Sequence, residues 1–273
     1  MNKHLDTGSY RFGGFGDDAG ELRRLDAQAR SAERIEVAAL KEAGVRPGLS
    51  IIDVGCGHGA VTRLLATMTG PEGSVLGLDS NPDLLAENRK GEHPANCRFA
   101  QADVYDLSAY RGQFDFAYGR FLLQHLERGP HAVEQISATV RPGGTICLAD
   151  VDDGWLTLEP EPSGFGAFLE RASRGQTRLG GDRRVGRKLA RYLSAAGCTS
   201  VRVGVHVISS DDLGLKTFLD LITGLKMEMI GADERADALR ERDDIYRLLE
   251  NPDARGFVGI FVATGVRAQA AMG

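Results

Sequence analysis

Residues 51–60, IIDVGCGHGA, decide the fold. An apolar run with one acid is followed by three glycines at alternate positions and then by a helix-forming sequence. Because Gly55, Gly57 and Gly59 carry no side chains, backbone N–H groups and the start of the helix can approach a ligand closely at this turn. The alternative is tight packing alone, since glycines occur at strand–helix turns in any doubly wound protein.

From residue 50 onward the chain alternates short apolar runs with amphipathic segments. Short, nearly all-apolar strands joined by crossover helices predict a parallel sheet that is covered on both faces. We therefore expect an α/β fold, Rossmann-like and doubly wound, with a mostly parallel seven-stranded sheet and helical lid insertions. The predicted strands are 50–54, 74–79, 97–100, 114–118, 145–151, 199–209 and 256–266. The predicted helices include 60–69, 82–90, 121–126, 131–140, 183–196 and stretches within 212–249.

The composition excludes several classes of protein. A chain of 273 residues with 42% hydrophobic content is long enough for one large α/β domain. Its net charge of −5 argues against nucleic-acid binding, which normally requires a basic surface. The N-terminal residues show no secretory pattern, and no apolar run approaches the roughly 18 residues of a membrane span. We therefore expect a cytoplasmic protein without membrane contact.

The cysteines and histidines show no metal-binding spacing. The four cysteines lie far apart in the chain, without a CxxC pair, which predicts reduced thiols. No HExxH pattern occurs, and the histidines are scattered. No metal site is expected.

Two acids lie at the ends of the second and third predicted strands. Asp79 ends SVLGLD, the position at which open α/β folds hydrogen-bond a ribose diol. Asp103 follows the third strand in AQADVYDL. Acids on neighbouring strand ends predict a bound nucleoside, held by the first acid through its hydroxyls and by the second through the adenine amino group. The open alternatives are that Asp79 caps the helix starting at Pro82 and that Asp103 makes an Asx turn.

Five motifs in order resemble those of the class I S-adenosylmethionine (SAM)-dependent methyltransferases. They are IIDVGCGHG, VLGLDSN, AQADVYDL, FDFAYGRFLLQHL and VRPGGTICLAD. The resemblance covers residues 50–151 closely. Through YRFGGFGDDAGELRRLDAQA it extends more loosely to Tyr10, in the manner of a bacterial small-molecule methyltransferase subgroup. The competing family is the nicotinamide dehydrogenases, whose GxGxxG pattern is replaced here by GxGxG followed by Ala60.

The resemblance implies a binding site for SAM, with S-adenosylhomocysteine as the product. It places the methionine end at the first strand and its glycines, the ribose at Asp79, and the adenine after the second and third strands. Further residues are implied after the fourth strand and in the N-terminal arm, where two side chains close over the cofactor. The implied cofactor residues are Tyr10, Gln28, Asp53, Gly55, Cys56, Gly57, Asp79, Ser80, Asp103, Val104 and Arg120.

Four segments are expected along the chain. Residues 1–48 form a helical arm that covers the cofactor, and 49–151 form the SAM-binding core. Residues 152–182 are predicted to be a lid insertion, because they contain turn residues and break the strand–helix rhythm. Residues 183–273 complete the core and carry a second helical lid segment at about 212–249.

Methyl transfer from a sulfonium is an in-line displacement, so the main task is to position the acceptor with water excluded. Such positioning can supply roughly 7–11 kcal/mol of a barrier. A base is needed only when the acceptor is protonated, and an imidazole suits that task. His125 follows the fourth strand and is the predicted catalytic base, the alternative being a histidine that packs against or caps its own helix.

Two helical patterns bear on the acceptor. Three arginines at i, i+3 and i+7 form one face that either binds an acceptor carboxylate or phosphate or is simply solvated. Four apolar residues at helical spacing indicate either the core of a helix or an apolar acceptor pocket. The arginines are Arg171, Arg174 and Arg178, and the apolar residues are Phe218, Ile222, Leu225 and Met229.

The resemblance implies an enzyme that moves a methyl group from SAM to O, N or C of a small organic acceptor, and its subgroup fits a setting in secondary metabolism. The alternatives are an NAD(P)-dependent oxidoreductase and a non-methylating SAM-binding enzyme of the same fold. The expected partner is a small molecule, with neither nucleic acid nor membrane involved, and a homodimer is an option.

Overall fold

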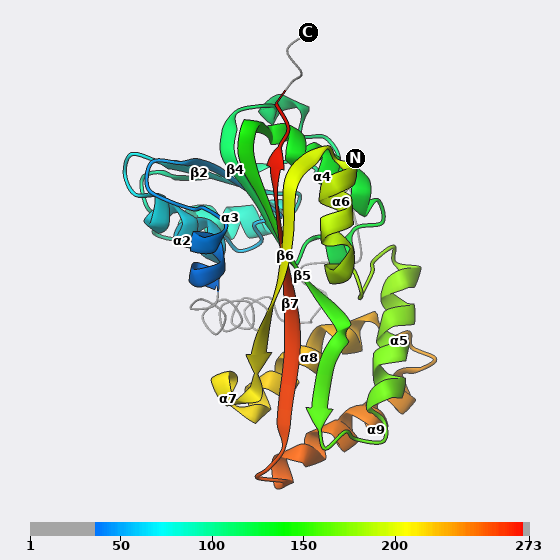
Figure 1. The fold of residues 1–273 in the computed structure, drawn as a ribbon. Coiled ribbons are helices and arrows are strands. Elements are labelled where there is room, and N and C mark those ends of the chain that lie inside the picture. Colours follow the sequence, from blue (N-terminus) through cyan, green and yellow to red (C-terminus); the bar gives the residue numbers. More distant parts are fainter. Residues whose placement is uncertain (1–35, 270–273) are drawn as a thin grey trace.

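The computed structural model describes residues 36–269, in which a seven-stranded sheet runs the length of the molecule (Figure 1). The strand order is β3-β2-β1-β4-β5-β7-β6. Strands β1 to β5 pair in parallel, and β7 pairs antiparallel with both β5 and β6. The predicted α/β fold with a mostly parallel sheet is confirmed. The strands are β1 Ser50–Val54, β2 Ser74–Asp79, β3 Cys97–Gln101, β4 Phe114–Arg120, β5 Val140–Glu159, β6 Cys198–Ser209 and β7 Arg255–Arg267.

The helices largely follow the predicted pattern. The α-helices are α2 Ala60–Thr69, α3 Pro82–Lys90, α4 Gly129–Thr139, α5 Phe165–Arg178, α6 Leu189–Ala195, α7 Ser210–Leu213, α8 Leu215–Met229 and α9 Arg235–Tyr246. Short 3-10 turns are η1 Ser108–Tyr110, η2 Leu123–His125, η3 Gly186–Lys188 and η4 Arg247–Glu250. The predicted helix at 121–126 is thus only the 3-10 turn η2. In the described part of the chain, no helix has the length and apolar character needed to cross a membrane.

Both faces of the first strands are covered, as their apolar runs predicted. Consecutive residues of a strand point to opposite faces of the sheet. Ile51 packs in one hydrophobic cluster with Leu65 of α2, whereas Ile52 packs in another with Ile136 of α4. Both isoleucines are fully buried. A central strand between two helical layers therefore reads as a continuous apolar run.

Strand β5 is much longer than the predicted 145–151 and runs to Glu159. The start predicted for the lid insertion, residue 152, therefore lies inside a strand. Asp152 and Asp153 interrupt the apolar pattern there, but each is tolerated because an arginine neutralises it. Arg187 contacts Asp152 at 2.7 Å, and Arg183 contacts Asp153 at 2.9 Å.

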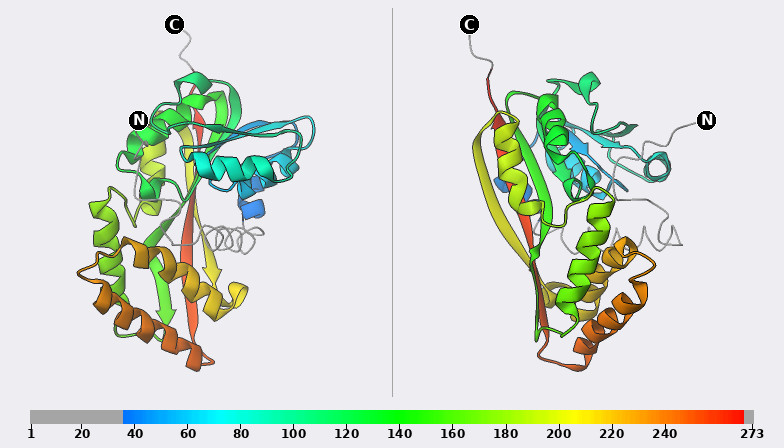
Figure 2. Two further views of the ribbon diagram at one scale, coloured as in Figure 1. Left: turned by 180° about the vertical axis from the view of Figure 1, so that it is seen from behind. Right: turned by 90° about the vertical axis from the view of Figure 1, so that its right-hand side faces the viewer.

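The extended strands carry a second hydrophobic core. Buried residues of β5, α5, α8 and α9 pack together there, among them Leu158, Phe168, Phe218 and Ala238. These helices lie on one side of the extended strands (Figure 2). We call α5, α7, α8, α9 and the strand segments that they cover the lid lobe. The helical segments predicted for the lid, far apart in sequence, thus share one core.

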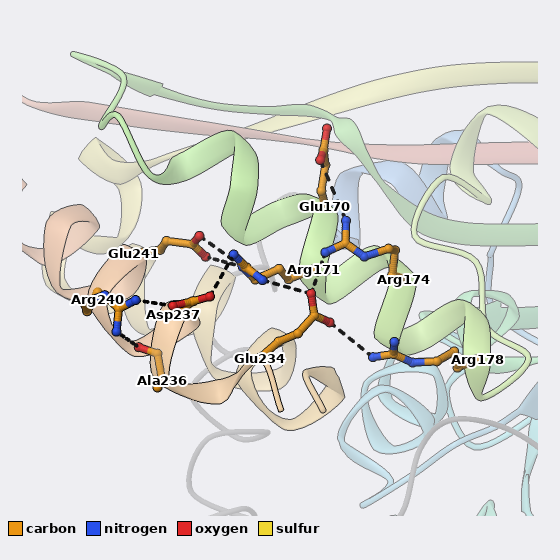
Figure 3. A network of polar contacts seen from close by, with 9 residues as sticks. All are labelled: Glu170, Arg171, Arg174, Arg178, Glu234, Ala236, Asp237, Arg240 and Glu241. Atoms are coloured by element: carbon orange, nitrogen blue, oxygen red, sulfur yellow. Dashed lines mark hydrogen bonds and ion pairs between the residues drawn. The ribbon is translucent and has the colours of Figure 1, made fainter. Parts of the chain in front are cut away.

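An ion-pair network joins α5 to α9 in the lid lobe (Figure 3). Arg171 contacts Glu241 at 3.1 Å and Glu234 at 2.9 Å. Arg174 and Arg178 also contact Glu234, at 2.7 and 3.5 Å. The interpretation of these arginines as acceptor ligands is wrong, because acids of the neighbouring helix take up their charges.

Candidate functional site

A cavity of about 320 Å³ lies between the lid lobe and the carboxyl ends of β1, β2 and β4. In open α/β sheets this edge is where ligands bind. Most residues predicted for the cofactor line it, which places them on one side of a single space. They are Asp53, Gly55, Cys56, Gly57, Asp79, Ser80, Val104 and Arg120.

Three predicted cofactor residues are not placed there. Tyr10 and Gln28 lie outside the described residues. Asp103 turns its carboxylate to its own backbone, where Oδ1 accepts the Tyr105 N–H at 2.9 Å. This is the Asx turn that the sequence left as the alternative. The following residue, Val104, lines the cavity instead, so the adenine role of the Asp103 side chain stays a prediction.

The turn from β1 into α2 is held open by its glycines. Gly55 and Gly57 have φ angles of 75° and 53°, in the left-handed region that favours glycine. A Cβ on Gly55 would lie 2.8 Å from a methyl carbon of Leu122, so close packing requires that glycine. A Cβ on Gly57 would meet no atom within 4 Å. The turn therefore combines tight packing on one side with open space on the other.

Asp79 ties this turn to the second strand. Its Oδ2 accepts the Gly57 N–H at 2.8 Å, and its Oδ1 accepts the Asn81 N–H at 2.9 Å. Asp79 does not cap α3, because Asn81 takes that position and accepts N–H groups of the first turn. Burial raises the pKa of Asp79. Its carboxylate keeps further lone pairs for a ligand, since an ionised carboxylate offers about four acceptor positions.

Asp53 lies buried at the end of β1. The hydroxyl of Thr62 in α2 donates a hydrogen bond of 2.6 Å to its Oδ2. Burial raises the pKa of Asp53 to about 7, and the Thr62 hydrogen bond only partly opposes this effect. The carboxyl therefore changes charge near neutral pH, on the side of the cavity predicted to hold the methionine end.

A buried acid at the end of β4, Glu36, was not predicted. Glu36 accepts a hydrogen bond of 2.7 Å from the Tyr118 hydroxyl and lies 3.1 Å from Nε of Arg120. It orients Arg120, the residue predicted to flank the methionine end. No spacing in the sequence links Glu36 to β4, because only the tertiary fold brings the two segments together.

His125 lies in η2 and lines the cavity. Its side chain is half-buried, with Nδ1 3.5 Å from Nε2 of Gln176. The same amide group of Gln176 donates to the backbone carbonyl of Gln124 at 2.7 Å. The ring is therefore positioned toward the lid lobe, as a base acting on an acceptor would have to be. Its catalytic role stays a prediction.

A buried polar corner was also not predicted. We give this name to Gln124, Asp153, Arg183 and Lys226, which line the cavity on the lid side. Arg183 holds both oxygens of Asp153 at 2.9 Å, and its Nη1 donates to Oε1 of Gln124 at 2.8 Å. Nζ of Lys226 lies 3.2 Å from Oδ1 of Asp153.

Two pKa values in the polar corner are shifted. Burial favours the neutral acid at Asp153, but Arg183 and Lys226 outweigh it and lower the pKa of this carboxyl to about 2. Burial, with Arg183 adding to it, lowers the pKa of Lys226 to about 8. The pattern of α8 contains a clue to this residue, because Phe218, Ile222 and Lys226 are spaced by four and so share the buried face.

The rest of the lid side is apolar. Leu156 of β5 and Phe218, Ile222 and Leu225 of α8 line the cavity. Phe218 and Ile222 also belong to the core of the lid lobe. One helix face therefore fills the core and also bounds the cavity, and its role toward an acceptor stays a prediction.

Comparisons with known proteins agree with this geometry. Residues 51–144 match the family described as methyltransferase domain. Trans-aconitate 2-methyltransferase of Deinococcus radiodurans is 38% identical over 120 residues, which are 44% of each chain. The chain spans about half the length of the curated relatives it matches first.

Solved structures share the fold. A putative methyltransferase of Bacillus halodurans gives a TM-score of 0.56 at 14% identity, over 85% of this chain and 98% of that one. The 4+2 cyclase SpnF also gives 0.56, at 19% identity, over 88% of this chain and 82% of the other. The family match and the methyltransferase relatives support a class I SAM-dependent methyltransferase, and the solved structures show that the fold is shared.

Proposed function

We propose that this chain transfers a methyl group from SAM to O, N or C of a small organic acceptor. The main support for the proposal is the hydrogen bond between the Gly57 N–H and Asp79 at the edge of the cavity. The glycine turn is open toward the cavity, and the carboxylate of Asp79 has further acceptor positions for a ligand. Asp79 would hold the ribose hydroxyls, and Asp53 with Arg120 would flank the methionine end. The chain would act by positioning the two substrates and excluding water.

The strand order and the likeness to a cyclase bear on the two alternatives, an NAD(P)-dependent oxidoreductase and a non-methylating SAM-binding enzyme. The classic dinucleotide fold has strand order 3-2-1-4-5-6, whereas here β7 enters antiparallel between β5 and β6. This difference favours SAM over a nicotinamide cofactor. The likeness to a cyclase supports keeping a non-methylating SAM-binding enzyme as the second candidate, because one fold can host different reactions.

Calorimetric titration separates these possibilities. S-adenosylhomocysteine should bind the full chain with measurable heat, and NAD should not. An acceptor screen with methyl-labelled SAM then tests turnover. Binding of NAD without binding of S-adenosylhomocysteine would contradict the proposal, whereas cofactor binding without any labelled product would favour the non-methylating candidate.

We further propose His125 as the base for an acceptor that must lose a proton. A positioned base typically contributes a factor of about 100 to 10,000 in rate. His125→Ala should therefore lower turnover by about that factor on an acceptor found in the screen, while the affinity for S-adenosylhomocysteine stays the same. Exposed His93→Ala is the matched control. Unchanged turnover of the His125 variant would remove the base from the mechanism.

The kind of acceptor and its setting are proposals as well. A small organic acid is one acceptor class in keeping with the relative named for trans-aconitate. Secondary metabolism is the setting that fits the small-molecule methyltransferase subgroup that the chain resembles. The labelled-SAM screen should therefore include organic acids, phenols and quinone-like compounds, and labelling confined to a protein or nucleic acid would contradict the small-molecule assignment.

A further inference from the structure

The polar corner buries two cations beside one carboxylate. The side chains of Arg183 and Lys226 are 6% and 5% exposed, and that of Asp153 is 9% exposed. Within residues 36–269, Asp153 is the carboxylate that contacts both cations. Because Asp153 carries a single negative charge, one positive charge at the corner is left over.

A second buried acid does not remove this excess below neutral pH. Asp150 accepts the backbone N–H groups of Gln124 and Val151, and its carboxylate does not contact either cation among the described residues. Burial raises the pKa of Asp150 to about 7. At pH 6 this carboxyl is therefore mostly neutral, while Arg183 and Lys226 remain charged.

Lys226 is not needed to neutralise the corner. Arg183 already holds both oxygens of Asp153, the strongest geometry for such a pair. A third charge adds a desolvation cost that a purely structural corner has no reason to bear. The ammonium has three N–H donors, and its residue lines the cavity.

The cavity wall beside the polar corner indicates the chemical character of the rest of the ligand. Beside the polar corner, the cavity wall is made by aliphatic and aromatic side chains such as Leu156, Phe218, Ile222 and Leu225. Sites of this kind take ligands with an apolar body and one oriented polar group. A single surplus positive charge matches a monoanion better than a dianionic phosphate. Carboxylates are ionised at pH 6, whereas phenols, with a pKa near 10, are not.

We propose that the acceptor is an apolar carboxylic acid whose carboxylate binds Lys226 at the polar corner. This assignment rests on the methyltransferase function proposed for the same cavity and adds the acceptor class to it. Lys226 is then a residue that determines specificity, and Arg183 with Asp153 holds it in place.

The experiment compares matched pairs of probes by calorimetry at pH 6. Cinnamate and octanoate are titrated against the full chain beside cinnamamide and octanamide, with and without S-adenosylhomocysteine. Phenyl phosphate supplies the dianion. The variants are Lys226→Met and Lys226→Arg, and Lys216→Met is the control, since Lys216 lies on the exposed side of the same helix.

In the wild type, at least one carboxylate should bind about tenfold or more tightly than its amide, as expected for a hydrogen bond between charged groups. Lys226→Met should abolish this preference, while Lys226→Arg and Lys216→Met should keep it. Equal binding of acid and amide, no binding of either carboxylate, tighter binding of phenyl phosphate, or a preference that survives in Lys226→Met would each overturn the proposal.

If Lys226→Met fails to fold, the wild-type comparison of acid with amide can still overturn the proposal, and Lys226→Arg still tests whether a cation at this position keeps the preference. The test also separates this inference from the proposed function. Failure of S-adenosylhomocysteine to bind contradicts the cofactor assignment, whereas the acid–amide comparison without the cofactor reports on the polar corner alone.

Discussion

At the scale of single residues, Asp79 connects two motifs that are 22 positions apart. Its carboxylate accepts N–H groups from Gly57 in the glycine turn and from Asn81 before α3. The position of Asp79 at a strand end predicted a ligand-binding role, and the structure places Asp79 in the lining of the cavity. Its contact with the glycine turn adds a second task, because the same side chain shapes the loop proposed to surround the cofactor.

Asp79→Ala should weaken the binding of S-adenosylhomocysteine by about 1.5–3 kcal/mol, the range for a lost hydrogen bond to a charged group. Calorimetry measures this change. Asp83→Ala, an exposed acid in the first turn of α3, is the control and should bind normally. Equal affinities of the Asp79 variant and the wild type would show that this carboxylate does not hold the ribose.

Residues on the strand side of the cavity could be predicted from the sequence, but those of the polar corner on the lid side could not. Asp53 and Asp79 lie at the ends of apolar strands and Gly57 comes shortly after one, and the ends of parallel strands meet at one edge of the sheet. Lys226 and Asp153 are 73 positions apart in segments without a shared pattern, and they meet only through the packing of α8 on β5. Spacing along the chain cannot reveal such a contact.

At the scale of elements, the lid lobe depends on a close crossing of α5 and α8. A Cβ placed on Gly175 of α5 would lie 1.8 Å from the backbone carbonyl oxygen of Met229, the last residue of α8. A backbone atom cannot move aside as a flexible side chain can. Gly175 is therefore required by the distance between the two helices.

Gly175→Ala should destabilise the chain by about 1–3 kcal/mol, the cost of forcing an extra methyl group into a packed contact. Thermal unfolding followed by circular dichroism measures the change. Gly166→Ala in the same helix is the control, because a Cβ there would meet nothing within 4 Å. A melting temperature for Gly175→Ala equal to that of Gly166→Ala would mean that the helices do not cross this closely.

At the scale of the whole molecule, buried acids make stability depend on pH. Burial raises the pKa values of Asp53 and Asp150 to about 7, above the usual value of 3.8. Between these values the folded state binds protons that the unfolded state releases. Stability should therefore fall as the pH rises from about 4 to 7.

The melting temperature should accordingly be higher at pH 5 than at pH 8, and Asp53→Asn should reduce this difference. Each carboxyl with a raised pKa changes the free energy of unfolding by at most about 1.4 kcal/mol per pH unit between its unfolded and folded pKa values. Asparagine suits this test because it still pairs with the Thr62 hydroxyl. The exposed Asp83→Asn is the control. An identical pH profile for Asp53→Asn and the wild type would assign the dependence to other groups.

The fold class of the whole molecule followed from the sequence, but the shape of the lid lobe did not. The apolar strands and glycine turn predicted the core, whereas the extension of β5 was hidden by Asp152 and Asp153. Each acid is stabilised by an arginine more than 25 positions away. A buried strand that contains charged residues can be recognised from the sequence only when the partners that neutralise those residues are known.

The most direct test of the central claim is a crystal structure of the chain with S-adenosylhomocysteine bound. We expect the adenosine to lie across the carboxyl ends of β1 and β2, with the ribose hydroxyls hydrogen-bonded to the carboxylate of Asp79 and the sulfur facing the lid lobe. Adenosine bound outside this cavity, or a ribose without contact to Asp79, would contradict the account.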